Sequence, residues 1–151
     1  MIASILTGLF YLFGIIFVIR QIEFVYDPIG EMEGINIFKQ FQQKYREARK
    51  ISREEALRYE AEYVALLQEY KYDLLLAIWV FVGLLSSQWL IFLVMILLDL
   101  FIINPIKRVA SQETLIKVVF WDSLLSCLLG ILILVNKYHL HINFFEILFG
   151  W

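Results

Sequence analysis

The sequence predicts an all-α integral membrane protein with four transmembrane helices, or alternatively three, and a helical cytoplasmic insertion between the first and second. Two observations predict this class. Hydrophobic residues make up 61% of the 151 residues and charged residues only 19%, which is more apolar surface than a soluble domain of this size can bury. The apolar residues also gather into blocks at 2–19, 74–103 and 118–135, and nearly uncharged blocks of about 18 residues are typical of membrane spans.

Residues 1–19 are predicted to form the first transmembrane helix. The block has no basic stretch before it and no small-residue cleavage site after it, so an uncleaved signal anchor fits better than a removed leader. The first basic residue is Arg20, at the carboxyl end of the block. Because basic residues collect on the cytoplasmic side of membrane proteins, we expect an external N-terminus and a cytoplasmic segment from residue 20 onward.

Residues 20–72 are predicted to form this cytoplasmic amphipathic helical insertion. Residues 20–36 are acidic and turn-like, with Pro28 in their middle. Apolar residues then recur at spacings of three or four on two helices, and the S-x-x-E capping box of Ser52 and Glu55 marks the break between them. The first helix is basic and the second acidic, which favours an antiparallel hairpin. The alternatives are one continuous helix, or a basic helix lying flat on anionic lipid.

The aromatic residues of these two helices are the candidate partner-binding residues. The periodicity places them on one face of each helix, and a helical face of this kind is suited to a partner helix. The candidates are Phe38, Phe41, Tyr45, Tyr59 and Tyr63.

Residues 73–136 are predicted to contain the second, third and fourth transmembrane helices. The apolar block that begins at Leu74 would be about 45 Å long as one helix, whereas the hydrocarbon core is only about 30 Å thick. Its one polar cluster is Ser86-Ser87-Gln88, and a tight turn there gives two short spans. With four spans, every Lys and Arg except Lys137 is cytoplasmic, as the distribution rule for basic residues favours. With three spans, the loop at 104–117 and its basic residues would be external.

Residues 137–151 form an aromatic, mildly amphipathic tail that is too short to span again, so we expect it at the outer interface. Its two histidines, His139 and His141, point apart on a helix and have no third ligand nearby in sequence, so no metal site is predicted. The single cysteine, Cys127, lies inside an apolar block, where an inert thiol is expected.

Two acids inside the apolar blocks, Asp99 and Asp122, are the candidate ion- or proton-handling residues. Counted from the helix ends, both lie about 8–9 Å from the same membrane face on consecutive antiparallel helices. Two carboxylates that face each other there can share a proton or hold a cation. The simpler interpretation is that each carboxylate reaches the membrane interface or pairs with a nearby cation. A third interpretation is that the two acids form hydrogen bonds between helices. The nearby cations are Lys107, Arg108 and Lys117.

The motifs of enzymes are missing from the sequence, so we expect no enzyme, no catalytic residue and no cofactor. The net charge of −2 does not suggest nucleic-acid binding. The expected partners are the lipid bilayer and either further copies of the chain or another membrane protein. We therefore predict an assembling or accessory subunit, multi-pass in an inner or plasma membrane, that acts through helix–helix interactions. The alternative is an oligomeric pore or ion channel, including a membrane-disrupting effector, in which Asp99 and Asp122 influence ion or proton passage.

Overall fold

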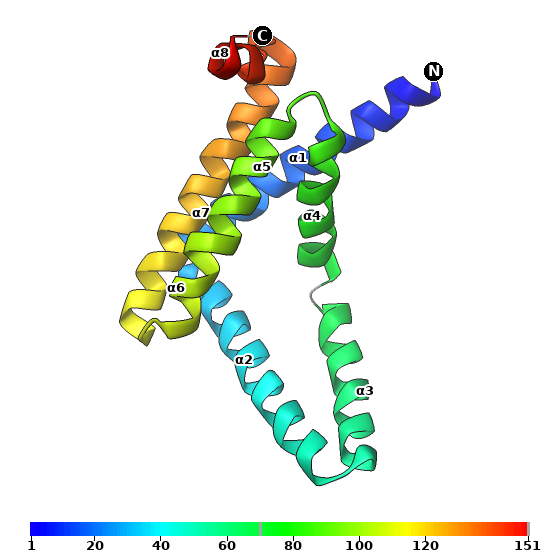
Figure 1. Ribbon diagram of the computed structural model, residues 1–151, viewed down its shortest axis with the longest axis vertical. Helices are drawn as coiled ribbons and strands as arrows, with labels where there is room; N and C mark the ends of the chain where they lie inside the picture. The colour runs from blue at the N-terminus through cyan, green and yellow to red at the C-terminus, as the bar shows by residue number, and fades with distance from the viewer. Residues whose placement is uncertain (70, 151) are drawn as a thin grey trace.

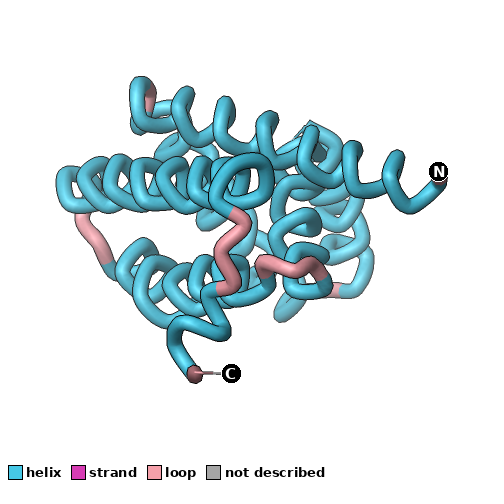
Figure 2. Tube along the Cα trace, turned by 90° about the horizontal axis from the view of Figure 1, so that it is seen from above, coloured by secondary structure: helices cyan, strands magenta, loops and turns pink. Residues whose placement is uncertain are grey.

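The computed structural model describes residues 1–69 and 71–150, without the side chains of Phe38, Leu67, Glu69 and Tyr72. Within this part the chain is helical and contains no strand, as predicted (Figures 1 and 2). The longer helices are α1 (Ile2–Tyr26), α2 (Pro28–Ile51), α3 (Arg53–Glu69), α4 (Lys71–Val82), α5 (Trp89–Leu98) and α7 (Gln112–Val135). The shorter ones are η1 (Gly83–Leu85), α6 (Asn104–Val109), α8 (Phe144–Phe149) and the π-helical turns η2 (Asp99–Ile103) and η3 (Asn136–Leu140).

The helices run back and forth between the two ends of the molecule (Figure 1). Helix α1 runs away from the end that holds both termini, and the α2–α3 hairpin continues beyond the other helices. Helix α4 returns, α5 and α6 run back, and α7 returns again to the end where α8 lies. The first turns of α1 project sideways from the rest, so Ile2, Ile5 and Leu6 are exposed.

Three helices in the described part of the chain are long and apolar enough to cross a membrane. They are Ile2–Tyr26, Trp89–Val109 and Gln112–Leu140. The apolar helix Asp73–Leu85 is shorter than these. The prediction of an all-α chain is therefore confirmed, and three of its helices have the length and apolar composition that a membrane span needs.

The turn predicted at Ser86-Ser87-Gln88 is present, and it reverses the chain between α4 and α5. The hydroxyl of Ser86 donates to the carbonyl oxygen of Gly83 at 2.6 Å and accepts from the backbone N–H of Gln88 at 3.2 Å. Gly83 is required beside the turn because a Cβ atom there would run into the ring of Phe92. The polar residues close the turn through local hydrogen bonds, and the glycine lets α4 and α5 approach closely.

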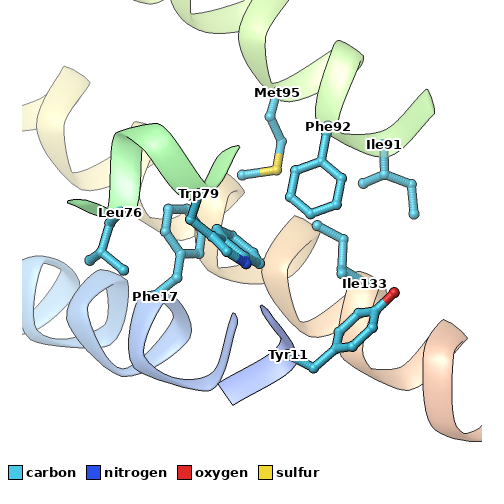
Figure 3. Packing of buried hydrophobic residues seen from close by; sticks show 8 residues of the cluster. All are labelled: Tyr11, Phe17, Leu76, Trp79, Ile91, Phe92, Met95 and Ile133. Carbon is cyan, nitrogen blue, oxygen red and sulfur yellow. The ribbon is translucent and has the colours of Figure 1, made fainter. Parts of the chain in front are cut away.

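Aromatic side chains form the centre of the bundle (Figure 3). Trp79 of α4 lies between Phe17 of α1 and Phe92 of α5, with ring centroids 5.2 and 5.0 Å away. Its indole N–H donates to the carbonyl oxygen of Phe10 at 2.8 Å, which satisfies the one polar group of the ring. In a bilayer the lipid tails are as apolar as these side chains, so such a bundle is held together by close packing and hydrogen bonding and not by exclusion of water.

A buried polar network joins the turn to the end of α7. The side-chain amide of Gln88 donates to the Tyr11 hydroxyl at 3.2 Å and to the Ile133 carbonyl oxygen at 3.0 Å, and its oxygen accepts from Asn136 at 3.0 Å. Asn136 also exchanges two hydrogen bonds with the backbone of Ile142. This network fixes the direction in which the tail leaves α7.

The expectation that residues 20–36 are turn-like is wrong. Helix α1 continues to Tyr26, and α2 begins at Pro28. Only Asp27 interrupts the helices, and its carboxylate accepts from the backbone N–H of Gly30 at 3.2 Å. The physical reason is that proline fits the first position of a helix and Asp is a favoured N-cap. Pro28 therefore starts a helix here instead of opening a loop.

The two helices of the insertion form an antiparallel hairpin, as the sequence favoured, and not one continuous helix. The break falls at Ser52, whose hydroxyl accepts from the backbone N–H of Glu55 at 3.2 Å. Ala48 and Ala56 are buried on either side of it, so small side chains let α2 and α3 come together at the tip.

Candidate functional site

Charged side chains of three helices meet at Lys107. Its ammonium group lies 2.6 Å from the carboxylate of Asp122 in α7 and 3.8 Å from that of Glu31 in α2. The Ser123 hydroxyl donates to Glu31 at 3.2 Å. The Lys107, Asp122 and Glu31 side chains are only 13%, 17% and 21% exposed. One cation thus lies between two half-buried carboxylates, and we call these three residues the Lys107 cluster.

Local structure places Lys107 in this position. The π-helical turn η2 and Pro105 precede it and shift the phase of the helix from α5 to α6. The hydroxyl of Ser111 then accepts from the backbone N–H of Thr114 at 3.4 Å and starts α7, so the chain reverses within a few residues. Asp122 lies in the third turn of α7, at the level to which a lysine side chain from α6 reaches.

Two further contacts fasten α2 to the same end of the bundle. The ammonium group of Lys39 donates to the backbone carbonyl oxygen of Lys107 at 2.5 Å. The side-chain amides of Asn36 and Gln112 exchange hydrogen bonds of 3.1 and 3.4 Å. The first half of α2 is thereby bound to α6 and to the start of α7.

Burial raises the pKa of the Glu31 carboxyl above its ordinary value. The attraction of Lys107 acts in the opposite direction, whereas the nearby charge of Asp122 raises the pKa further. The hydrogen bond from Ser123 favours the ionised form. Burial prevails, so Glu31 holds its proton more readily in the folded chain than in an unfolded one.

The two candidate acids, Asp99 and Asp122, line the same cavity of about 250 Å³. Lys107 and Glu31 line it as well. Asp122 forms an ion pair with Lys107, which agrees with the simpler interpretation that each acid pairs with a nearby cation. The carboxylate of Asp99 accepts from the side-chain amide of Asn104 at 3.2 Å and is exposed. The structure therefore brings both acids to one place, with a lysine bound to one of them.

A second and larger cavity, of about 770 Å³, lies between α1, α2 and α4. Arg20 lines it and binds two acids: its guanidinium donates to Asp73 at 3.1 Å and to Glu23 at 2.8 Å. The Arg20–Asp73 pair joins the end of α1 to the start of α4.

The aromatic candidates of the insertion hold the hairpin itself together. The Phe41 ring stacks on Tyr63, with centroids 5.5 Å apart, and meets Tyr59 edge-on at 6.2 Å. The Tyr45 hydroxyl donates to Glu60 at 3.4 Å. The side chain of Phe38 lies outside the described residues. The face expected to receive a partner is thus largely occupied by the neighbouring helix, although Tyr63 remains 40% exposed.

The sequence interpretation gave no role to Glu31 or Asp73. Glu31 was assigned to a turn, and no pattern pairs it with residues far along the chain. The signal that could have placed it is Pro28, because a helix that starts there carries Glu31 in its first turn, close to the end of α1.

The other chemical candidates stay apart from one another. Cys127 is buried and free, and His139 and His141 are exposed. Among the residues that the structure describes, no group of three His, Cys, Asp or Glu side chains is arranged to hold a metal ion.

The fold and these sites define an all-helical chain with three helices that are long and apolar enough to cross a membrane, and with charged residues gathered at one end of the bundle. Comparison of the chain with models of protein families, with curated proteins and with solved structures gives no match.

Proposed function

We propose that the chain is a multi-pass membrane protein without catalytic activity that acts as an assembling subunit and holds a partner through helix–helix contacts. The observation that carries this proposal is the open packing of the bundle. Helix α1 packs along α7, whereas α4 stands away from α2 and leaves the cavity of about 770 Å³. A bundle with such a space on one side has a place for one more element.

The proposed topology has four spans, with α4 and α5 as a short pair joined at residues 86–88. The hairpin and the loop between α6 and α7 lie on the cytoplasmic side, and both termini lie outside. Two contacts support this arrangement, because Lys39 binds the backbone of Lys107 and Asn36 binds Gln112. These contacts favour an arrangement in which the hairpin and the α6–α7 loop share one side of a membrane.

Cysteine labelling tests the topology. In a Cys127→Ala background, Ser87→Cys and Ser111→Cys place single thiols at two exposed positions at opposite ends of the bundle. An impermeant maleimide added to sealed cells should label position 87 and leave position 111 unlabelled until the membrane is opened. Labelling of position 111 in sealed cells would show that the four-span arrangement is wrong.

Mass measurement tests the assembling role. We expect the chain, extracted from its native membrane in mild detergent, to give a native mass well above its own 17.9 kDa. The additional mass should correspond to a fixed number of subunits, and this number should persist through two purification steps. A chain that is strictly monomeric after extraction, and that forms no cross-links in the intact membrane, would refute the proposal.

The second candidate function is an oligomeric pore. The observation that favours it is the gathering of Asp99, Asp122 and Lys107 around one cavity within the candidate spans. Reconstituted chains should then make vesicles leaky to small cations, and Asp99→Asn should lower the flux without changing the oligomeric state. Tight vesicles that contain correctly folded chain would eliminate this function and leave the assembling role intact.

A further inference from the structure

The two cavities of the bundle are parts of one groove. Both are lined by Phe17, Gln21, Glu31 and Ala77, so they meet along α1 and at the start of α2. Helix α4 forms one wall, and α5 with η2 and α6 forms the other. The two walls begin together at the turn that joins α4 to α5 and separate from there toward the hairpin (Figure 1). We call this space the α4–α5 groove.

The walls of the groove are apolar toward the turn. Val80 and Phe81 line it from α4. Met95 and Leu98 of α5, together with Leu129 of α7, line it from the other helices. The Phe81 side chain is 56% exposed, although it belongs to the apolar stretch of its helix. This part of the groove is therefore suited to apolar side chains at membrane depth.

The end of the groove toward the hairpin is acidic. Carboxylates outnumber cations among its lining residues. The carboxylates are those of Glu23, Asp27, Glu31, Asp73, Asp99 and Asp122, and the cations are Arg20 and Lys107. Arg20 and Lys107 are already paired with four of these acids. Asp27 and Asp99 have hydrogen bonds from Gly30 and Asn104, and neither has a salt-bridge partner in the part of the chain that the structure describes.

We infer that the α4–α5 groove receives an apolar helix of the partner that carries a Lys or Arg toward the acidic end of the groove, where Asp99 and Asp27 line it. This inference rests on the proposed assembling function and names the surface through which it acts. An apolar helix fits the walls near the turn, and its basic side chain offsets part of the negative charge that Asp27 and Asp99 leave at the other end. An anionic lipid headgroup carries the wrong charge for this end of the groove, which favours a helix over a phospholipid as the occupant.

Cross-linking of the full chain to synthetic helices in vesicles of neutral phosphatidylcholine tests the inference. The chain carries Cys127→Ala and Ala77→Cys, which puts a single thiol in the wall of the groove. The probes are apolar helices of about 20 residues, long enough to cross a bilayer. Each has one cysteine at the depth of position 77 and either Lys, Leu or Glu near its cytoplasmic end.

We expect the Lys helix to form the disulfide with position 77 roughly fivefold more than the Leu helix, which corresponds to a preference of about 1 kcal/mol. The Glu helix should react less than the Leu helix. In Asp27→Asn/Asp99→Asn this order should collapse, because the carboxylates without salt-bridge partners are then neutral. The existing ion pairs of Arg20 and Lys107 are left intact by this double variant.

A matched control places the thiol at Leu128, which is 56% exposed on α7 and does not line the groove. Leu128→Cys should react equally with the three probes. Equal reaction of the three probes at position 77 would overturn the inference. Disulfides between two copies through position 77 would also overturn it, because the groove would then face a second copy of the chain. If the native complex keeps its mass in Asp27→Asn/Asp99→Asn, the assembling function stands and the groove is not its surface.

Discussion

The ammonium group of Lys107 lies 2.6 Å from the carboxylate of Asp122, and this ion pair joins one candidate span to the next across the α6–α7 turn. The same lysine faces Glu31 of α2 at 3.8 Å. One side chain therefore links two apolar helices with the hairpin that extends beyond them. An isolated charge in such a place is costly, so the three groups are stable only together.

Removal of the cation should destabilise the fold. Lys107→Met keeps most of the length of the side chain but removes its charge and leaves Asp122 and Glu31 without their common partner, so we expect the free energy of unfolding to fall by about 1–3 kcal/mol. Thermal unfolding in detergent measures it. The control is Lys117→Met, which removes an exposed pair with Glu113 and should change stability by about 0–1 kcal/mol. Equal losses in the two variants would mean that the Lys107 cluster contributes no more than a surface pair.

The raised pKa of Glu31 predicts a pH dependence of known sign. Between the value of an unfolded Glu, about 4.3, and the higher folded value, the folded chain binds more protons than the unfolded one. Stability contributed by Glu31 is therefore present at low pH and is lost as the pH rises through this window. Melting temperatures across this window should fall more steeply in the parent chain than in Glu31→Gln. Parallel curves would contradict the assignment of the shift to Glu31.

The close contact of Gly83 with Phe92 predicts a destabilising substitution. Gly83→Ala places a methyl group where the ring lies, and overpacking of this kind costs about 1–3 kcal/mol. Phe92→Leu should recover part of the loss in the double variant by making room. The control is Gly8→Ala, because a Cβ atom at Gly8 meets nothing within 4 Å. Gly8→Ala should leave stability unchanged or raise it, since alanine favours helix more than glycine does.

The ring contacts of Phe41 predict an effect confined to the hairpin. Phe41→Ala removes the stack on Tyr63 and the edge contact with Tyr59, and each such aromatic contact contributes about 0.5–1.5 kcal/mol. Limited proteolysis should then cut α2 and α3 faster, with cleavage near Arg49 and Arg58, while thermal unfolding of the bundle stays as in the parent. If Phe41→Ala releases a partner without faster cleavage, the aromatic face binds that partner directly.

Local patterns predicted the parts of the fold that local chemistry determines. The capping box of Ser52 and Glu55 ends one helix and starts the next, and Ser86 closes the turn between α4 and α5, through bonds that reach only two or three residues along the chain. Their hydrogen-bond partners are therefore close neighbours in the sequence. The apolar blocks could be recognised as candidate spans for a similar reason, because the length of a span follows from the thickness of a bilayer.

Contacts between distant segments could not be predicted in the same way. Arg20 binds Asp73 across 53 positions, and Ser123 binds Glu31 across 92. Which acid meets which cation depends on how α1, α2 and α7 turn about their axes. The π-helical turn at Asp99 changes the phase of its helix without any proline or glycine inside it. The sequence predicted that Asp99 and Asp122 lie near each other, and both line one cavity, but the lysine that pairs with Asp122 could only be named as one of three cations.

The joint between α1 and α2 is a single residue, Asp27, and it turns α2 into a lever. At 1.5 Å per residue, Ile51 lies about 35 Å from Pro28, whereas Glu31 lies only about 4.5 Å from it. A displacement of the hairpin tip is reduced roughly eightfold at Glu31, and the force there is multiplied by the same ratio. A pull on the tip therefore loads the contacts of Lys39 with Lys107 and of Asn36 with Gln112 as well as the contact between Glu31 and Lys107, and a shift of one ångström at Glu31 moves the tip by several.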